Sequence, residues 1–427
     1  MTTRAAPARL AEALAPLIAL LAFAALHGKG IGMIQDGWAA WQGAVSIAQG
    51  HGYTYFTGNP IVAWPPLYST WLALGTLLCG PTGLSLVLSN GLLIVLQAWA
   101  WMRLVLRLAR DTDIRLSLVP QLLLAAFLGL FLAVNQMQVF SHVLVYLFLP
   151  LYLGALWSCL DREALRPVDL MLPVVLGTAL VLTHNTAVVF VGMAAIMLAL
   201  RAHGQPNLFV QLLMIAVPTV LPFVAWDLLR LVLNQTGSHH VGLGAGKYGP
   251  LDYLLQLIGG PAALLVSDRA GIAYGAALAL WGLAAWLCRN AEARALRFAA
   301  QFALGAGILL FALFNVTWVF NTLSSPRYIL FVPLLLVPVT FLTALPLAPR
   351  TASLVLALLL LPQLYWTGQW TARQQRSTFA ELDVPGGFAP IDGYLSRDYL
   401  TGPTVRTPRG LLMPPLAGEE PKDRQHD

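Results

Sequence analysis

Long apolar runs recur along this chain, and they limit its possible folds more than any other feature. Several are long enough to cross a hydrocarbon layer of about 30 Å as an α-helix. Of the 427 residues, 58% are hydrophobic and only 10% are charged, whereas about a quarter of the residues of a soluble domain are charged. Since a soluble protein of this size needs a charged surface, the sequence predicts an all-α polytopic membrane protein.

The apolar runs predict about eleven transmembrane helices. Their approximate ranges are 12–27, 83–107, 115–134, 139–160, 168–183, 186–201, 208–233, 270–288, 297–320, 327–345 and 351–370. Arg4 and Arg9 precede the first run, as in a signal peptide, but the many later runs favour an uncleaved first helix. The fifth and sixth runs are short, which is typical of helices that break around a cavity.

The segment 66–80 decides the predicted topology. Its fifteen residues reach only about 22 Å as a helix, which is too short for a full crossing. If it does not cross, eleven arginines fall in loops on one face and three basic residues on the other before the tail. The eleven are Arg103, Arg107, Arg110, Arg115, Arg162, Arg166, Arg201, Arg289, Arg294, Arg297 and Arg350, and the three are Lys247, Arg269 and Arg327. Because basic loops mark the cytoplasmic face, we expect a cytoplasmic N-terminus, an external C-terminus, and a juxtamembrane or re-entrant helix at 66–80 that begins at prolines.

This topology gathers the polar loops on the outer face of an inner or plasma membrane. They are residues 28–82, 135–141, 183–186, 234–268, 321–327 and the tail. We therefore predict a transmembrane domain over 1–370, in which the first outer loop (28–82) carries juxtamembrane helices. A short, polar, Pro-rich tail follows over 371–427, and low order is the default expectation for it. The functional site should face outward.

Asp36 is the most unusual residue of the first outer loop. It is the only acidic residue between Glu12 and Asp111, and tryptophan, tyrosine, glycine and proline surround it. Loops that carry function hold such residues on a rigid scaffold, and ionisable groups beside a membrane are functional candidates. The alternative is an exposed Asp in a turn or helix cap.

Arg327 and His184 are the candidate phosphate ligands of the outer face. Arg327 opens the tenth span after Pro326, where its planar fork of donors suits a phosphate. The alternative for Arg327 is an interfacial arginine that reaches toward lipid headgroups. His184 interrupts the apolar run between the fifth and sixth spans. It could donate to a phosphate or a sugar hydroxyl, or it could belong to an ordinary interfacial turn.

Other polar groups give weaker signals. The amides of Asn135–Gln138, with Ser141 and His142, suit sugar hydroxyls, although polar helix ends look the same. Asp227 and Arg230 could pair with each other at helical spacing or line a cavity. The three cysteines have no CxxC spacing, and no HExxH or GxSxG motif is present, so neither a disulfide framework nor a metal site is predicted. The basic residues are too scattered for a nucleic-acid partner.

These motifs together resemble the GT-C superfamily of integral-membrane glycosyltransferases, including its aminoarabinose transferase and protein O-mannosyltransferase branches. The first-loop residues that carry the resemblance are Asp36, Ala44, Ala48, Gly50, Gly52, Tyr53 and Pro65-Pro66-Leu67-Tyr68. Arg327-Tyr328 followed by Pro333 is similar to the family's "RY…P" helix, and Leu182–Thr186 resembles its break between helices. Gly37 stands where a second acid is common, and Trp64 stands where some branches have a lysine.

The resemblance implies an outward-facing glycosyltransferase that uses a polyprenyl-phosphate-linked sugar and an unidentified lipid, glycan or protein acceptor. Asp36 would be the general base, while Arg327 and His184 would bind the donor phosphate. The residues expected to line the substrate cavity are Tyr53, Trp64, Tyr68, Gln138, His142, Asn185 and Tyr328. No cofactor is expected; a divalent metal is the alternative, but a lone Asp is a poor site for one. A lipid-linked sugar flippase or transporter, and a non-catalytic GT-C-like subunit, are the alternative hypotheses.

Overall fold

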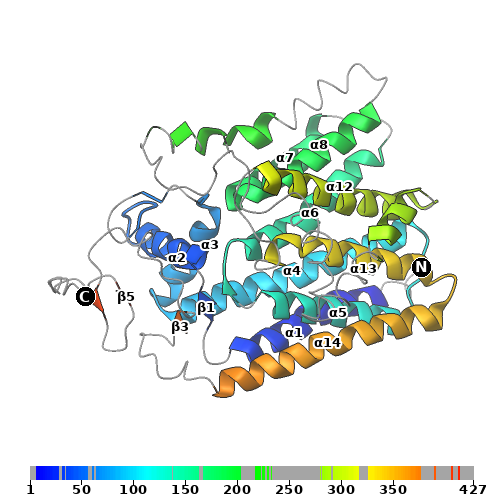
Figure 1. Ribbon diagram of the computed structural model, residues 1–427, viewed down its shortest axis with the longest axis horizontal. Helices are drawn as coiled ribbons and strands as arrows, with labels where there is room; N and C mark the ends of the chain where they lie inside the picture. The colour runs from blue at the N-terminus through cyan, green and yellow to red at the C-terminus, as the bar shows by residue number, and fades with distance from the viewer. Residues whose placement is uncertain are drawn as a thin grey trace.

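The computed structural model shows a bundle of α-helices with a few two-residue strands (Figure 1). It describes residues 6–27, 31–33, 35–55, 60–61, 64–136, 138–162, 167–202, 217–222, 224–226, 228–229, 232, 279, 281–289, 292–316, 326–376, 389–390, 405–406 and 412–413. The helices named in Figure 1 are α1 (Ala6–His27), α2 (Gln35–Ala48), α3 (Leu67–Cys79), α4 (Gly83–Asp111), α5 (Leu118–Asn135), α6 (His142–Leu160), α7 (Pro167–Thr183), α8 (Val188–Ala202), α12 (Arg294–Val316), α13 (Phe331–Ala344) and α14 (Pro349–Arg376). Two short 3₁₀ helices, η1 (Asn185–Ala187) and η2 (Pro326–Ile329), precede α8 and α13.

Five of the described helices are long and apolar enough to cross a membrane. The spans are Leu10–His27, Leu84–Asp111, Leu118–Asn135, His142–Leu160 and Pro349–Gln369. Shorter apolar helices include α3, α7 and α13. These lengths support an integral membrane protein, while the total of eleven spans stays a prediction.

The predicted spans from 12–27 to 186–201, and from 297–320 to 351–370, each contain a described helix. The predicted spans 208–233 and 270–288 contain helical residues at 217–222 and 281–288, but most of both ranges lies outside the described residues. The segment 66–80 forms α3, whose N-cap is Pro66. The predicted placement of α3 as a juxtamembrane or re-entrant helix is still a prediction.

Small residues bring α1 close to α5 in the bundle. Ala11, Ala15 and Ala19 recur every fourth residue of α1, and all three are buried. A Cβ atom at Gly129 of α5 would lie 2.8 Å from the carbonyl oxygen of Ala15, so only glycine fits there. Membrane helices commonly use small residues in this way, because lipid tails leave little hydrophobic drive for helix association.

The helices differ in the share of their residues that is buried in the bundle. In the α6 span 72% of residues are buried, against 17% in the α14 span. The outward residues of α14 include Leu354, Leu358, Leu361 and Leu364, each more than half exposed. Their spacing places them on one helical face, and exposed leucines on a membrane span indicate contact with lipid tails.

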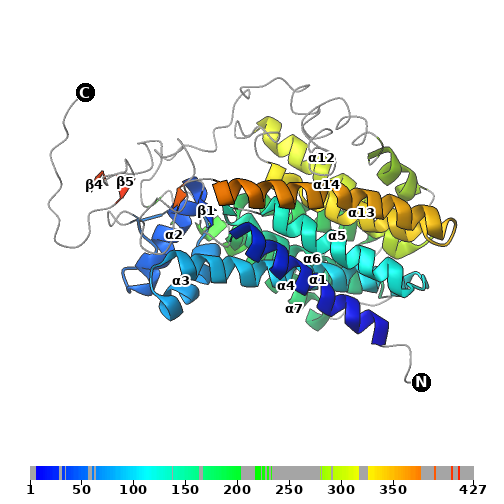
Figure 2. The ribbon, with the colours of Figure 1, turned by 90° about the horizontal axis from the view of Figure 1, so that it is seen from below.

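Three distant segments meet at one end of the bundle. Strand β1 (Gly32–Met33) pairs in parallel with β2 (Gln138–Val139) and with β3 (Ala389–Pro390). Helices α2 and α3 lie at this same end, whereas the start of α1 lies at the opposite end (Figures 1 and 2). A further short pair joins β4 (Val405–Arg406) to β5 (Leu412–Met413). The end that contains β1, β2 and β3 is called the loop end below.

Candidate functional site

Two histidines and a tyrosine form a ring cluster in which three predicted site residues meet. The ring centroids of His142 and His184 lie 4.1 Å apart. The Tyr328 ring stands edge-on to both, at 4.6 Å from His142 and 5.9 Å from His184. All three side chains are buried, with exposed fractions of 6% or less. The sequence places these residues far apart, so only the packing of α6, η1 and η2 unites them.

His142 is held at the first residue of α6. Strand β2 ends at Val139, and the backbone turns so that the Val143 N–H donates to the Phe140 carbonyl at 3.1 Å. The Phe140 ring packs beside His142 with its centroid at 5.8 Å. Pairing of β2 with β1 therefore fixes the point at which α6 begins, and with it the position of His142.

His184 follows the last residue of α7 and is the N-cap of η1. Its backbone is extended (φ −158°, ψ 138°), and its Nδ1 accepts a hydrogen bond from the Thr186 N–H at 3.1 Å. The Thr186 hydroxyl lies 2.8 Å from the same nitrogen. Because Nδ1 accepts, this hydrogen-bond pattern assigns a neutral ring with the proton on Nε2. His184 is thus oriented as a donor through Nε2.

Tyr328 lies in η2, directly after Arg327. The 3₁₀ turn brings the backbone of Arg327 next to the ring cluster. The side chain of Arg327 lies outside the described residues. Its proposed contact with a phosphate is therefore still a prediction, although its place in the chain beside Tyr328 fits that role.

Asp36 lies in the first turn of α2, and its side chain is also outside the described residues. The backbone of its neighbour Gly37 packs directly on β2, since a Cβ atom at Gly37 would collide with the carbonyl oxygen of Val139. Val139 precedes His142 by three residues. The start of α2 therefore rests on the strand that leads into the ring cluster.

Tyr53 and Tyr68 make hydrogen bonds that hold the segment between α1 and α4 in place. The Tyr53 hydroxyl donates to the Trp64 carbonyl at 3.1 Å and accepts from the Ser69 hydroxyl at 3.5 Å. Burial raises the pKa of the Tyr53 phenol, so it stays protonated and remains a donor. The Tyr68 hydroxyl donates to Oδ1 of Asn90 in α4 at 2.8 Å. These bonds show a packing role, while contact with substrate is still a prediction.

The other candidate residues are less informative. Gln138 pairs through its backbone with Gly32, and its side chain lies outside the described residues. Asn185 begins η1 beside His184. Asp227 and Arg230 both lie outside the described part of the chain.

A buried pair of amides was missed as a unit by the sequence analysis. The Gln97 side chain donates to Oε1 of Gln136 at 3.1 Å and to the Val143 carbonyl, while Gln136 donates back to Gln97 at 2.5 Å. Both side chains are 1% exposed or less. The sequence does contain one sign of this pair: Gln97 is the only glutamine in the largely apolar α4. A buried amide needs hydrogen-bond partners, so its presence there indicates a polar contact. Gln97 therefore joins α4 to the C-terminal end of α5 and to the first turn of α6, close to His142.

The site offers neutral donors and aromatic rings. Among the described residues, no group of three or more His, Cys, Asp or Glu is placed to hold a metal ion. His142 and His184 thus have no third ligand in that part of the chain. A neutral histidine and a tyrosine suit hydrogen bonds to hydroxyls or phosphate oxygens, and their rings offer flat surfaces for packing.

No protein-family model, curated protein or solved structure matched the chain.

Proposed function

We propose that the chain is a membrane glycosyltransferase that moves a sugar from a polyprenyl-phosphate donor to an acceptor at the outer face. One observation carries the proposal: segments that bear the GT-C-like motifs converge at the loop end of the bundle. Gly37 rests on Val139, the last residue of β2, and α6 begins three residues later at His142, which contacts His184 and Tyr328. Asp36 and Arg327 are the sequence neighbours of Gly37 and Tyr328.

Asp36 is the proposed general base. It takes the proton from the acceptor hydroxyl while that oxygen attacks the anomeric carbon of the sugar. The bond from the anomeric carbon to the phosphate oxygen breaks, and polyprenyl phosphate leaves with the electron pair. One displacement at one carbon inverts the anomeric configuration.

Arg327 and His184 are the proposed donors to the leaving phosphate. Negative charge grows on its oxygens as the bond breaks, so donors aimed there stabilise the transition state more than the ground state. His184 is oriented to donate through Nε2 because Thr186 occupies Nδ1. His142 and Tyr328 would shape the wall against the sugar or phosphate.

The test is an assay of purified protein in proteoliposomes with defined polyprenyl-phosphate sugars and a panel of acceptors. The transferase proposal expects three results: a glycosylated acceptor, an equal amount of released polyprenyl phosphate, and an inverted anomeric centre. Movement of the lipid-linked sugar across the bilayer without any transfer would instead identify a flippase. The absence of both activities with every donor and acceptor tried would favour a non-catalytic subunit.

A further inference from the structure

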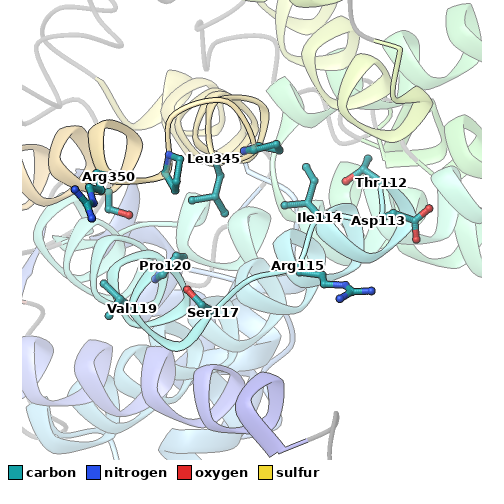
Figure 3. A pocket seen from close by; sticks show the side chains of 12 residues that line it. Thr112, Asp113, Ile114, Arg115, Ser117, Val119, Pro120, Leu345 and Arg350 are labelled. Atoms are coloured by element: carbon teal, nitrogen blue, oxygen red, sulfur yellow. The ribbon is translucent and has the colours of Figure 1, made fainter.

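A pocket of about 870 Å³ lies where α4 ends and where α5 and α14 begin (Figure 3). These helix ends lie at the end of the bundle opposite the loop end (Figure 1). The segment after α4, the first turn of α5, the connection after α13 and the first turn of α14 form its walls. Its volume falls within the range of about 300–1,000 Å³ that is usual for ligand sites. The proposed transferase site uses none of its residues.

The pocket lies where apolar spans of the bundle begin and end. Three of the apolar spans have an end at it: one ends at Asp111, one begins at Leu118 and one begins at Pro349. Large apolar side chains at and beside the pocket are exposed, including Val119 at 60% and Leu347 at 81%. A ligand here would therefore meet polar groups on one side and lipid tails on the other.

Two arginines give the pocket its positive charge. Figure 3 shows Arg350 at one end and Arg115 at the other, with Asp113 beyond Arg115. Within the described part of the chain, ion pairs join Arg107 to Asp111 and Arg162 to Asp169, but none involves Arg115 or Arg350. With two cations and one carboxylate, the lining carries a net positive charge.

Hydroxyl groups and helix ends add to the attraction for an anion. Ser117 is the N-cap of α5 but makes no side-chain cap hydrogen bond, and Ser353 also lines the pocket. The first turns of α5 and α14 both border it, and the N-terminus of a helix carries a partial positive charge. These groups support the arginines as binding partners for phosphate oxygens.

We propose that this pocket binds the phosphate headgroup of an anionic phospholipid, with the acyl chains lying along the exposed apolar residues beside it. Arginine forks suit phosphate oxygens, and basic pockets between membrane helices on the cytoplasmic side bind such headgroups. Free inorganic phosphate shares the headgroup chemistry, but it would make no use of Val119 and Leu347. The apolar border therefore favours a lipid.

Native mass spectrometry of the purified full-length chain tests this site. Phosphatidylglycerol or phosphatidylcholine is added in neutral detergent, and bound lipid is counted. The wild-type protein should retain phosphatidylglycerol in preference to phosphatidylcholine. Each basic residue near an anionic lipid contributes about fivefold in affinity, so Arg115→Gln with Arg350→Gln should weaken phosphatidylglycerol binding by about thirtyfold.

The matched control is Arg110→Gln with Arg289→Gln. Both side chains are exposed and lie outside the pocket lining, and the net charge changes equally. The control should bind phosphatidylglycerol like the wild type. Equal losses in the two double variants would show general surface attraction and overturn the site. Unchanged binding by the pocket variant would overturn it as well.

Inorganic phosphate distinguishes the two sources of the same chemistry. If millimolar phosphate displaced phosphatidylglycerol completely, the pocket would be a free-anion site and the lipid assignment would be wrong. Retention of the lipid in phosphate buffer supports the proposal. Each single variant, Arg115→Gln or Arg350→Gln, should bind phosphatidylglycerol about fivefold more weakly than the wild type. The single variants therefore still test the site if the double variant does not fold.

Discussion

The two ends of the helix bundle differ in whether their polar side chains are buried or exposed. The loop end buries polar side chains, among them His142, His184 and Gln97. The opposite end exposes its arginines, including Arg115 and Arg350. Burying a polar group costs free energy unless it is hydrogen-bonded, whereas an exposed charge needs no protein partner. Buried polar groups are therefore fixed in position, while exposed charges are available to ligands.

Arg107 shows that the arginine-bearing end also contains structural cations. Its guanidinium donates to the Gly154 carbonyl at 2.7 Å and lies 3.4 Å from the Asp111 carboxylate. Asp111 also accepts from the Trp157 indole at 2.8 Å. These bonds fasten α4 to α6. Arg107 therefore differs from Arg115 and Arg350, which border a pocket.

The largest predicted effect belongs to the loop end. Asp36→Asn is nearly isosteric but cannot take a proton, so sugar transfer should fall by about 10²- to 10⁴-fold while donor binding is preserved. Single-turnover kinetics and donor titration measure the two quantities. Asp161→Asn, an exposed carboxylate at the end of α6, is the control and should transfer at the wild-type rate. Near-normal transfer by Asp36→Asn would remove Asp36 from the mechanism.

Arg327→Ala should lower the transfer rate at low donor concentration by about a hundredfold, because one donor to the developing charge is lost. Arg327→Lys keeps the charge but not the fork, so its rate should lie between those of wild type and Arg327→Ala. Initial rates across a donor series give the comparison. An Arg327→Ala variant as active as wild type would reduce Arg327 to an interface anchor.

Gly37→Ala tests the contact between α2 and β2. Helix propensity alone would favour alanine by up to about 1 kcal/mol, but the new Cβ collides with the Val139 carbonyl. We expect a net loss of about 1–3 kcal/mol in unfolding free energy, as for other overpacked sites, together with reduced transfer. Gly368→Ala in α14 has nothing within 4 Å of its Cβ and should be neutral or stabilising. Thermal unfolding in detergent distinguishes these outcomes, and a stabilised Gly37→Ala would contradict the observed packing.

The smallest effect is expected for the buried amides. Gln97→Leu removes the bonds to Gln136 and Val143 and should cost about 1 kcal/mol, as interhelical hydrogen bonds in membranes do. Adding Gln136→Leu removes the unpaired partner and should recover part of the loss. Gln301→Leu, which is exposed on α12, is the control. If Gln97→Leu and the control unfold at the same temperature, the amide pair contributes no stability.

The sequence alone was sufficient for the membrane-protein class and for the ranges of most described helices. Hydropathy and helix length are local properties, so they can be read along the chain without knowledge of its partners. The segments with unusual polar residues were also visible there, including those around Asp36, His142, His184 and Arg327. Their functional roles are still predictions.

Only the tertiary structure decided which of these segments meet. The parallel pairing of β1 with β2 joins residues more than a hundred positions apart, and two-residue strands carry no periodic signal in the sequence. The packing of His142, His184 and Tyr328, and the pairing of Gln97 with Gln136, depend in the same way on helices that are distant in the chain. The pocket between Arg115 and Arg350 likewise exists only where α5 and α14 begin side by side. Contacts of this kind arise from how whole helices pack, which no local pattern of residues encodes.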